Sequence, residues 1–329
     1  MLLLHAGATG NTAARLAHAL GIGGADLDEL DRHRSSLSQT ADADDGVRLL
    51  SAVSLWAKRS LRLKSDFLAA AQAMDTELPQ VELDDMSACV AINKWVQART
   101  GGQIDHLIDP GDIAPGTPLL ILTALYFKGR WGQPFDPSLT SEGSFKLADG
   151  TIQRVPMMHR TGPFSYGEFE HCRALELPFG SGRVCMRLLL PVMPWASDDQ
   201  AMSDLLELPG LQERLGEVAL PRSRVDVSTD LVEALTAVGV GVLFGPEAEF
   251  GGISDNGVWV SRVKQRTTVT LDEEGAEGAA AMSIHFIRSF VPPDFTFVVD
   301  RPFYWTISDT ESDRLLLVGF VANPSEARL

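Results

Sequence analysis

Residues 271–293 constrain the fold of this 329-residue chain most strongly, because their pattern suits two conformations. The four residues 268–271 alternate threonine with an aliphatic residue, the period of two that a half-buried strand requires. The small residues that follow, at 275–281, favour a helix by their alanine content. Gly275 and Gly278 weaken that interpretation, since a glycine disfavours a helix interior by about 1 kcal/mol.

A second pattern runs through the same stretch. The even positions 276–286 carry no charge, whereas Glu277 and His285 stand at odd positions. Because a strand places alternate residues on opposite faces, the segment can form one long strand with an uncharged face. The segment is flanked by Glu-Glu-Gly at 273–275 and by Pro-Pro at 292–293, which are residue types that commonly border a loop. Two alternatives follow: an alanine-rich surface helix, or an exposed loop that can enter a sheet as a strand.

Composition and charge exclude several classes of partner. The net charge of −16 disfavours nucleic acid, whose unspecific binding rests on Lys and Arg neutralising phosphate, and disfavours an anionic membrane surface. Cys89, Cys172 and Cys185 are scattered, without disulfide or metal-ligand spacing, so buried thiols are expected. The first ten residues lack the pattern of a signal peptide and no segment approaches a membrane span, which makes a cytoplasmic location the default and does not exclude secretion.

No catalytic or cofactor motif is evident. The chain has no phosphate-binding glycine loop, no dinucleotide fingerprint and no Gly-x-Ser-x-Gly elbow. Its seven histidines are dispersed and form no metal-ligand pair. The small basic cluster Arg32, His33 and Arg34 lies next to acids, so no polysaccharide cofactor is expected either. The sequence therefore indicates no cofactor, no metal and no enzyme.

Periodicity and turn residues predict the regular elements. Residues 2–6 form a short apolar segment that ends at Gly7, and Pro221 is expected to end a strand. Helices are expected at 13–20, 31–39, 64–74, 87–97, 203–208 and 231–238, and strands at 49–56, 117–127, 217–220, 295–299, 303–307 and 315–321.

Several motifs, taken in order along the chain, resemble those of the serpins, the serine protease inhibitor family. Each one alone is weak, but the ordered set extends from near residue 3 to residue 324. The matching segments are 93–96 (NKWV), 100–104 (TGGQI), 124–131 (ALYFKGRW), 134–135 (PF), 155–158 (VPMM), 176–179 (ELPF), 272–281 (DEEGAEGAAA), 301–303 (RPF) and 319–324 (GFVANP).

The resemblance implies an α+β fold, with one serpin domain over residues 1–329. A large central mixed sheet, two smaller sheets and surrounding helices are expected, with a reactive-centre loop at about 273–293 that inserts as a strand. Compared with the family, the first helix and the start of the second are expected to be missing. A monomer is expected, with polymerisation as its alternative.

The resemblance also implies a mechanism. In serpins a protease cuts the loop and forms an acyl-enzyme, and the cut loop then enters the main sheet and traps the protease. No bulky, charged or proline residue stands on the inward face of the hinge here, which favours an active inhibitor. The alternatives are a non-inhibitory binding or chaperone-like serpin, an inactive truncated serpin, and a hydrolase with a dispersed site. The hinge residues are Glu273, Glu274, Gly275, Ala276, Glu277, Gly278, Ala279, Ala280 and Ala281.

The reactive bond is predicted by counting from the hinge glycine Gly275, as in most inhibitory serpins. That count gives Ser289–Phe290, which suits elastase-like or subtilisin-like proteases. A loop one residue shorter gives Arg288–Ser289, which suits trypsin-like enzymes, whose specificity pocket holds a carboxylate.

Three residues are assigned to the region where the family's main sheet opens: Thr123, Trp131 and Gln265. The family usually has Asn in place of Thr123 and His in place of Gln265, and it adds serines that would precede Met1. Two alternatives follow. Thr123 and Gln265 form a substitute hydrogen bond, or the opening point is weakened and the protein converts readily to the inserted state or to polymers.

Overall fold

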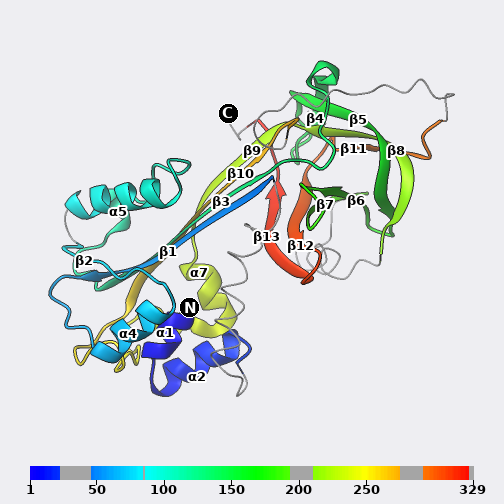
Figure 1. The fold of residues 1–329 in the computed structure, drawn as a ribbon. Coiled ribbons are helices and arrows are strands. Elements are labelled where there is room, and N and C mark those ends of the chain that lie inside the picture. Colours follow the sequence, from blue (N-terminus) through cyan, green and yellow to red (C-terminus); the bar gives the residue numbers. More distant parts are fainter. Residues whose placement is uncertain (23–45, 84–85, 193–209, 275–291, 326–329) are drawn as a thin grey trace. The chain divides into compact units, whose positions relative to one another are not determined.

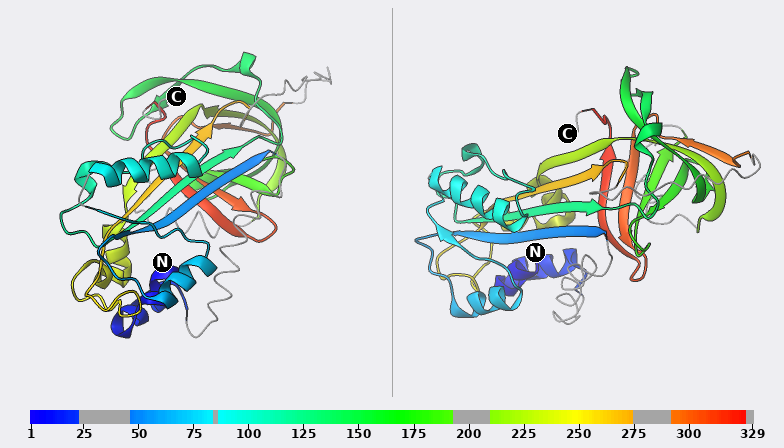
Figure 2. Two further views of the ribbon diagram at one scale, coloured as in Figure 1. Left: turned by 60° about the vertical axis from the view of Figure 1, so that its left-hand side comes forward. Right: turned by 45° about the horizontal axis from the view of Figure 1, so that its top comes forward.

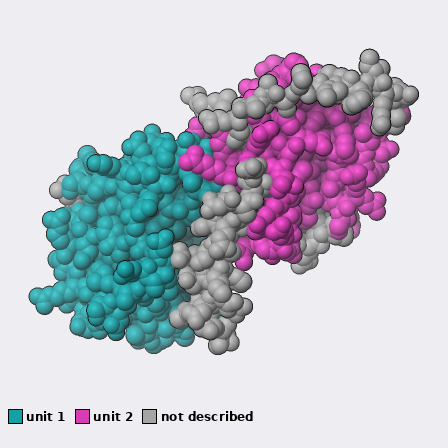
Figure 3. Space-filling model, in the orientation of Figure 1, with its two compact units in different colours: residues 1–39, 49–126, 226–268 teal, residues 40–48, 127–225, 269–329 magenta. Residues whose placement is uncertain are grey.

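A computed structural model of the chain describes residues 1–22, 46–83, 86–192, 210–274 and 292–325. Two compact units are distinguished within it (Figure 3). Unit 1 comprises residues 1–39, 49–126 and 226–268, and unit 2 comprises residues 40–48, 127–225 and 269–329. The assignment of the whole chain to one domain stays a prediction.

A five-stranded sheet, whose strands have most of their length in unit 1, is the framework for the predicted loop insertion (Figure 1). Its order is β2-β1-β3-β10-β9, so that β3 and β10 are hydrogen-bonded neighbours. They lie side by side and their arrows run in the same direction in both views of Figure 2. The bounds are β1 Val47–Lys58, β2 Gln80–Val81, β3 Leu119–Gly129, β9 Ser223–Asp230 and β10 Val260–Leu271.

Strand β3 is central because its nearly continuous apolar sequence is buried on both faces. Leu119 and Ile121 belong to the core beneath the helices α1, α2 and α4, whereas Leu120 and Leu122 belong to the core beneath α5. Figure 2 shows these two groups of helices on opposite faces of the sheet. Because alternate residues of a strand face opposite sides, β3 contributes side chains to two separate cores.

The helices of unit 1 agree with the predicted elements in most cases. Residues 2–6, expected only as a short apolar segment, form a helix that continues through Gly7, because Leu3, Leu4 and Gly7 all face the core. The helix expected at 231–238 is α-helical only over its first turn, and Gly239 with φ +93° interrupts the irregular turns that follow. The bounds are α1 Leu2–Gly7, α2 Gly10–Ala19, α4 Ser65–Ala73, α5 Met86–Arg99 and α7 Val232–Leu235, with short helical turns at Pro110–Asp112, Thr236–Val240 and Gly241–Phe244.

Unit 2 contains an eight-stranded sheet with the order β11-β8-β5-β6-β7-β12-β13, and β4 pairs with β5. The two smaller sheets that were expected are joined here, because the 17-residue strand β5 pairs with β4, then β8, then β6 along its length. The bounds are β4 Ser141–Lys146, β5 Ile152–Glu168, β6 Cys172–Pro178, β7 Val184–Pro191, β8 Gln212–Pro221, β11 Phe295–Val298, β12 Phe303–Asp309 and β13 Arg314–Val321, and Pro137–Leu139 forms a helical turn.

Most remaining expectations about local structure are confirmed. One correction concerns Pro221, which does not break the strand at 217–220 but is itself the last residue of β8, opposite Met157. A proline is tolerated where one side of a strand is unpaired, and β11 pairs with β8 only as far as Ala219. All three cysteines are buried. The helices expected at 31–39 and 203–208 lie outside the described residues. Over the described parts of the chain, no helix has the length and apolar character to cross a membrane.

Candidate functional site at the hinge base

The candidate site lies in unit 2, where the chain leaves β10 and enters the predicted reactive-centre loop. Strand β10 ends at Leu271, and Asp272, Glu273 and Glu274 are the last described residues before the loop. We call these three residues the hinge base, and the last two of them, Glu273 and Glu274, are the first residues of the predicted hinge. The other hinge residues, Gly275 to Ala281, and the candidate cleavage residues Arg288, Ser289 and Phe290 lie outside the described residues.

The hinge base is held by the segment that follows β3. The backbone N–H of Trp131 donates a 3.2 Å hydrogen bond to the carbonyl oxygen of Glu274, and the N–H of Phe135 donates one of 2.9 Å to that of Glu273. The indole Nε1 of Trp131 donates to the carbonyl oxygen of Asp272 at 2.8 Å. Within the hinge base, the N–H of Glu274 donates to Asp272 Oδ1 at 3.2 Å, which turns the chain. Trp131, assigned from the sequence, therefore contacts the hinge directly.

Glu273 is the charged centre of this site, although it is only 5% exposed. Its Oε1 accepts a 2.6 Å hydrogen bond from the hydroxyl of Thr140 and forms an ion pair with the guanidinium of Arg222. Burial alone would raise the pKa of this carboxyl group, but the hydrogen bonds from Arg222 and Thr140 outweigh it and hold the pKa below its ordinary value. Glu273 therefore stays charged in the folded protein, with its partners in place.

Two aromatic rings pack against the indole of Trp131. The ring of Phe179 stacks on the indole at a centroid distance of 4.4 Å, and Phe135 meets it edge-on at 6.1 Å. Gly129 lies against this stack, since a Cβ atom built there would come within 2.6 Å of Phe179. Only glycine fits that position without displacing the ring. Trp131, which holds the hinge base by hydrogen bonds, is thus itself packed in an aromatic cluster.

Two residues of the site were missed from the sequence: Arg222 and Thr140. Arg222 follows the end of β8 and Thr140 follows a helical turn, and neither stands in a matching motif. The one available indication was that the acidic residue Glu273, adjoining a buried strand, needs a cation. A buried charge must be paired, but its partner's position along the chain is not encoded locally.

The other residues assigned to sheet opening belong to unit 1. Thr123 is half-buried on β3, and Gln265 is half-buried on β10. The amide of Gln265 donates a 3.2 Å hydrogen bond to Thr267 on its own strand. Among the described residues Gln265 thus bonds to Thr267 and not to Thr123, as the first of the two alternatives would require. A weakened opening point stays a prediction.

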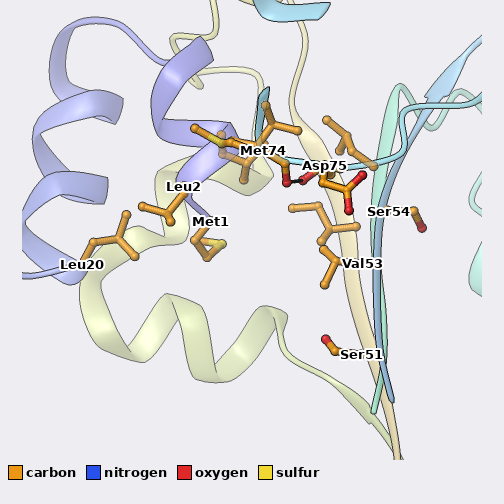
Figure 4. A pocket seen from close by; sticks show the side chains of 13 residues that line it. Met1, Leu2, Leu20, Ser51, Val53, Ser54, Met74 and Asp75 are labelled. Carbon is orange, nitrogen blue, oxygen red and sulfur yellow. Dashed lines mark hydrogen bonds between the residues drawn. The ribbon is translucent and has the colours of Figure 1, made fainter. Parts of the chain in front are cut away.

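A separate apolar pocket of about 330 Å³ lies in unit 1 (Figure 4). Its walls come mainly from α1 and β1, with residues such as Leu2, Leu4 and Val53, and Asp75 follows α4 at the same pocket. It contains none of the predicted site residues. Among the described residues there is also no group of three or more His, Cys, Asp or Glu side chains that could hold a metal ion.

Comparisons with known proteins identify the family of the chain. The sequence profile of the family described as "Serpin (serine protease inhibitor)" matches residues 1–324. The leukocyte elastase inhibitor of Bos taurus is 30% identical over 344 aligned residues, covering 98% of this chain and 90% of the relative. The protein Iris of Ixodes ricinus is 31% identical over 339 aligned residues, covering 96% and 87%.

The fold is likewise that of solved serpin structures. Native protease nexin-1 with heparin aligns with a TM-score of 0.84 at 26% identity, covering 98% of this chain and 89% of that structure. The thermophilic serpin tengpin in its native state aligns with a TM-score of 0.88 at 22% identity, covering 98% and 85%, which speaks for the fold alone. The chain therefore belongs to the serpins, a family of serine protease inhibitors and not of enzymes.

Proposed function

We propose that this protein inhibits a serine protease as a suicide substrate, with residues 273–293 as the bait. The target cuts the loop and becomes joined to it as an acyl-enzyme. The freed loop then enters the five-stranded sheet between β3 and β10 before water releases the protease. The observation that carries the proposal is the strand order of the sheet. The chain continues from β10 into the bait, and β3 and β10 are hydrogen-bonded neighbours with no other strand between them.

Strand direction supports this path of insertion. Because β3 and β10 run the same way, a strand that folds back from the end of β10 into the seam between them would be antiparallel to both. It would replace one strand–strand contact with two, so that the backbone hydrogen bonds of a sixth strand would provide the driving force. The native five-stranded sheet is thus the state from which insertion starts.

The sequence of the hinge is compatible with burial of one face. Ala276, Gly278 and Ala280 alternate, carry no charge and are small, so they can pass under covering helices. Glu277, by the same alternation, would face the other side of an inserted strand, so that no unpaired charge would be buried on the inward face, where it would cost several kcal/mol. This alternation supports an inhibitory serpin over a non-inhibitory one.

The first experiment is incubation with elastase, subtilisin and trypsin, followed by denaturing gels and mass spectrometry. We expect an SDS-stable complex with elastase or subtilisin and a released peptide that begins at Phe290. A peptide beginning at Ser289 together with a trypsin complex would move the reactive bond to Arg288. Cleavage by all three proteases without any complex would contradict the inhibitory function.

A matched pair of hinge variants tests insertion itself. Ala280→Arg places a charge on the predicted inward face, and Ala279→Arg places the same charge one residue away on the predicted outward face. Ala280→Arg should turn the inhibitor into a substrate that is cut but forms no complex, while Ala279→Arg should retain complex formation. Equal behaviour of the two variants would contradict insertion as an alternating strand.

A further inference from the structure

Three cations stand at alternate positions of β10: Arg262, Lys264 and Arg266. The period of two places them on one face of the strand. Two acids of the neighbouring β9 pair with them, Asp230 with Arg262 at 3.3 Å and Asp226 with Arg266 at 2.8 Å. These two pairs join β9 and β10, which lie on the same side of the β3–β10 seam.

The same three cations also contact a segment that is not part of the sheet. We call residues 104–112, between α5 and β3, the crossing segment. Arg262 contacts Asp112 Oδ1 and Lys264 contacts Asp112 Oδ2, so that one carboxylate is shared by two cations of β10. Arg266 also donates from Nη1 to the carbonyl oxygen of His106.

The crossing segment is fixed at its other side to α5. Asn93 accepts hydrogen bonds from the N–H groups of Leu107 at 2.8 Å and Ile108 at 3.1 Å, and its Nδ2 donates to the carbonyl oxygen of Ile108 at 3.0 Å. Leu107 and Ile108 are buried in the core that α5 shares with β3. The chain then continues into β3 at Leu119. The crossing segment is therefore attached to α5 by hydrogen bonds and to β3 through the chain, whereas ion pairs attach it to β10.

We propose that Asp112 is a latch that ties β3 to β10 and thereby slows opening of the seam between them. This inference rests on the proposed function, because the seam is where the cut loop would enter. Separation of β3 from β10 must break both contacts of Asp112 or pull the crossing segment away from α5. The latch would set how long the native five-stranded state persists.

Burial and charge make the ion pairs of Asp112 the strongest contacts between the crossing segment and β10. Its side chain is 14% exposed and that of Lys264 is 13% exposed, so solvent screens the pair far less than it screens a surface ion pair. The N–H of Asp109 also donates to Asp112 Oδ2 at 2.8 Å. Although burial opposes the charged form, the hydrogen bonds from Asp109 and Lys264, together with the charges of Lys264 and Arg262, lower the pKa of Asp112.

The test measures seam opening without any protease. A synthetic peptide with the sequence of residues 276–289 is added to the intact protein, and its uptake into the sheet is followed on native gels and by mass spectrometry. Asp112→Asn keeps the size of the side chain but removes its charge. We expect roughly tenfold faster uptake, since one carboxylate serves two partly buried cations.

Asp230→Asn is the matched control, because it removes a carboxylate from Arg262 within the β9–β10 pair without releasing the crossing segment. Its uptake rate should equal that of the wild type. Lys264→Met is the second latch variant and should accelerate uptake, with thermal unfolding checked for each protein. An unchanged rate in both latch variants, equal acceleration by Asp230→Asn, or no uptake by any variant would overturn the latch. Normal uptake without protease inhibition would instead overturn the proposed function and leave the latch standing.

Discussion

Thr140 donates a 2.6 Å hydrogen bond to Glu273 through the same carboxylate oxygen, Oε1, that Arg222 contacts. One buried atom at the start of the predicted bait loop therefore receives a neutral and a charged donor from two other parts of unit 2. A carboxylate bound in this way keeps the chain in register at the point where β10 ends. The loop that follows would begin from a defined position and direction.

Removal of Arg222 should destabilise the protein, and this loss should depend on the presence of Glu273. Arg222→Met leaves the carboxylate of Glu273 buried without its cation, and we expect a loss of about 2 kcal/mol in the free energy of unfolding. The double variant Arg222→Met with Glu273→Gln should lose less than the sum of the single losses. Urea unfolding of the four proteins measures the cycle, and additive losses would mean that the pair is not coupled.

The stability contributed by Glu273 should disappear in acid. Its pKa in the folded protein lies below the ordinary value of 4.5, so the contribution is present above 4.5 and is lost as the pH falls through the folded pKa. Glu273→Gln lacks this titration. The difference in free energy of unfolding between wild type and Glu273→Gln, measured from about pH 7 to about pH 3, should therefore shrink on acidification. A difference that grows towards low pH would contradict the depressed pKa.

Trp131 should report what happens at the hinge. Its indole donates to the carbonyl oxygen of Asp272, and the chain's six tryptophans include Trp95, which donates to Glu77 in unit 1. Loop cleavage should change the intrinsic fluorescence of the wild type, because insertion would rearrange the contacts around Asp272. Trp131→Phe should abolish most of this change and Trp95→Phe should retain it. The reverse result would place the rearrangement away from the hinge base.

Gly129 should be intolerant of a side chain. A Cβ atom there would come within 2.6 Å of Phe179, which stacks on Trp131. Gly129→Ala should lower the free energy of unfolding by roughly 1–3 kcal/mol, the usual range for overpacking. Gly257→Ala is the control, because a Cβ atom there meets nothing within 4 Å and the backbone is not left-handed. Thermal unfolding distinguishes the two, and equal stability would mean that the aromatic stack shifts freely.

The local sequence pattern was sufficient to predict the helices and strands that bury a continuous or periodic apolar face. Residues 117–127 predicted β3, and residues 87–97 predicted α5, within two residues at each end. Residues 2–6 were not predicted as a helix, because one turn and a half of apolar residues shows no period until the core it covers is known. The joining of the smaller sheets was likewise missed, since the length of β5 shows only when its three partners are in place.

The sequence by itself determined the family, the hinge composition and the assignment of Trp131, because those depend on residue types in a fixed order along the chain. Only the tertiary structure decided which side chains pair with the buried charges. Arg222 and Thr140 contact Glu273, and Asp112 contacts Lys264. The reason is physical. A buried charge requires a partner, but hydrogen bonds and ion pairs act over a few ångströms in space, whereas Lys264 and Asp112 are 152 positions apart in the chain.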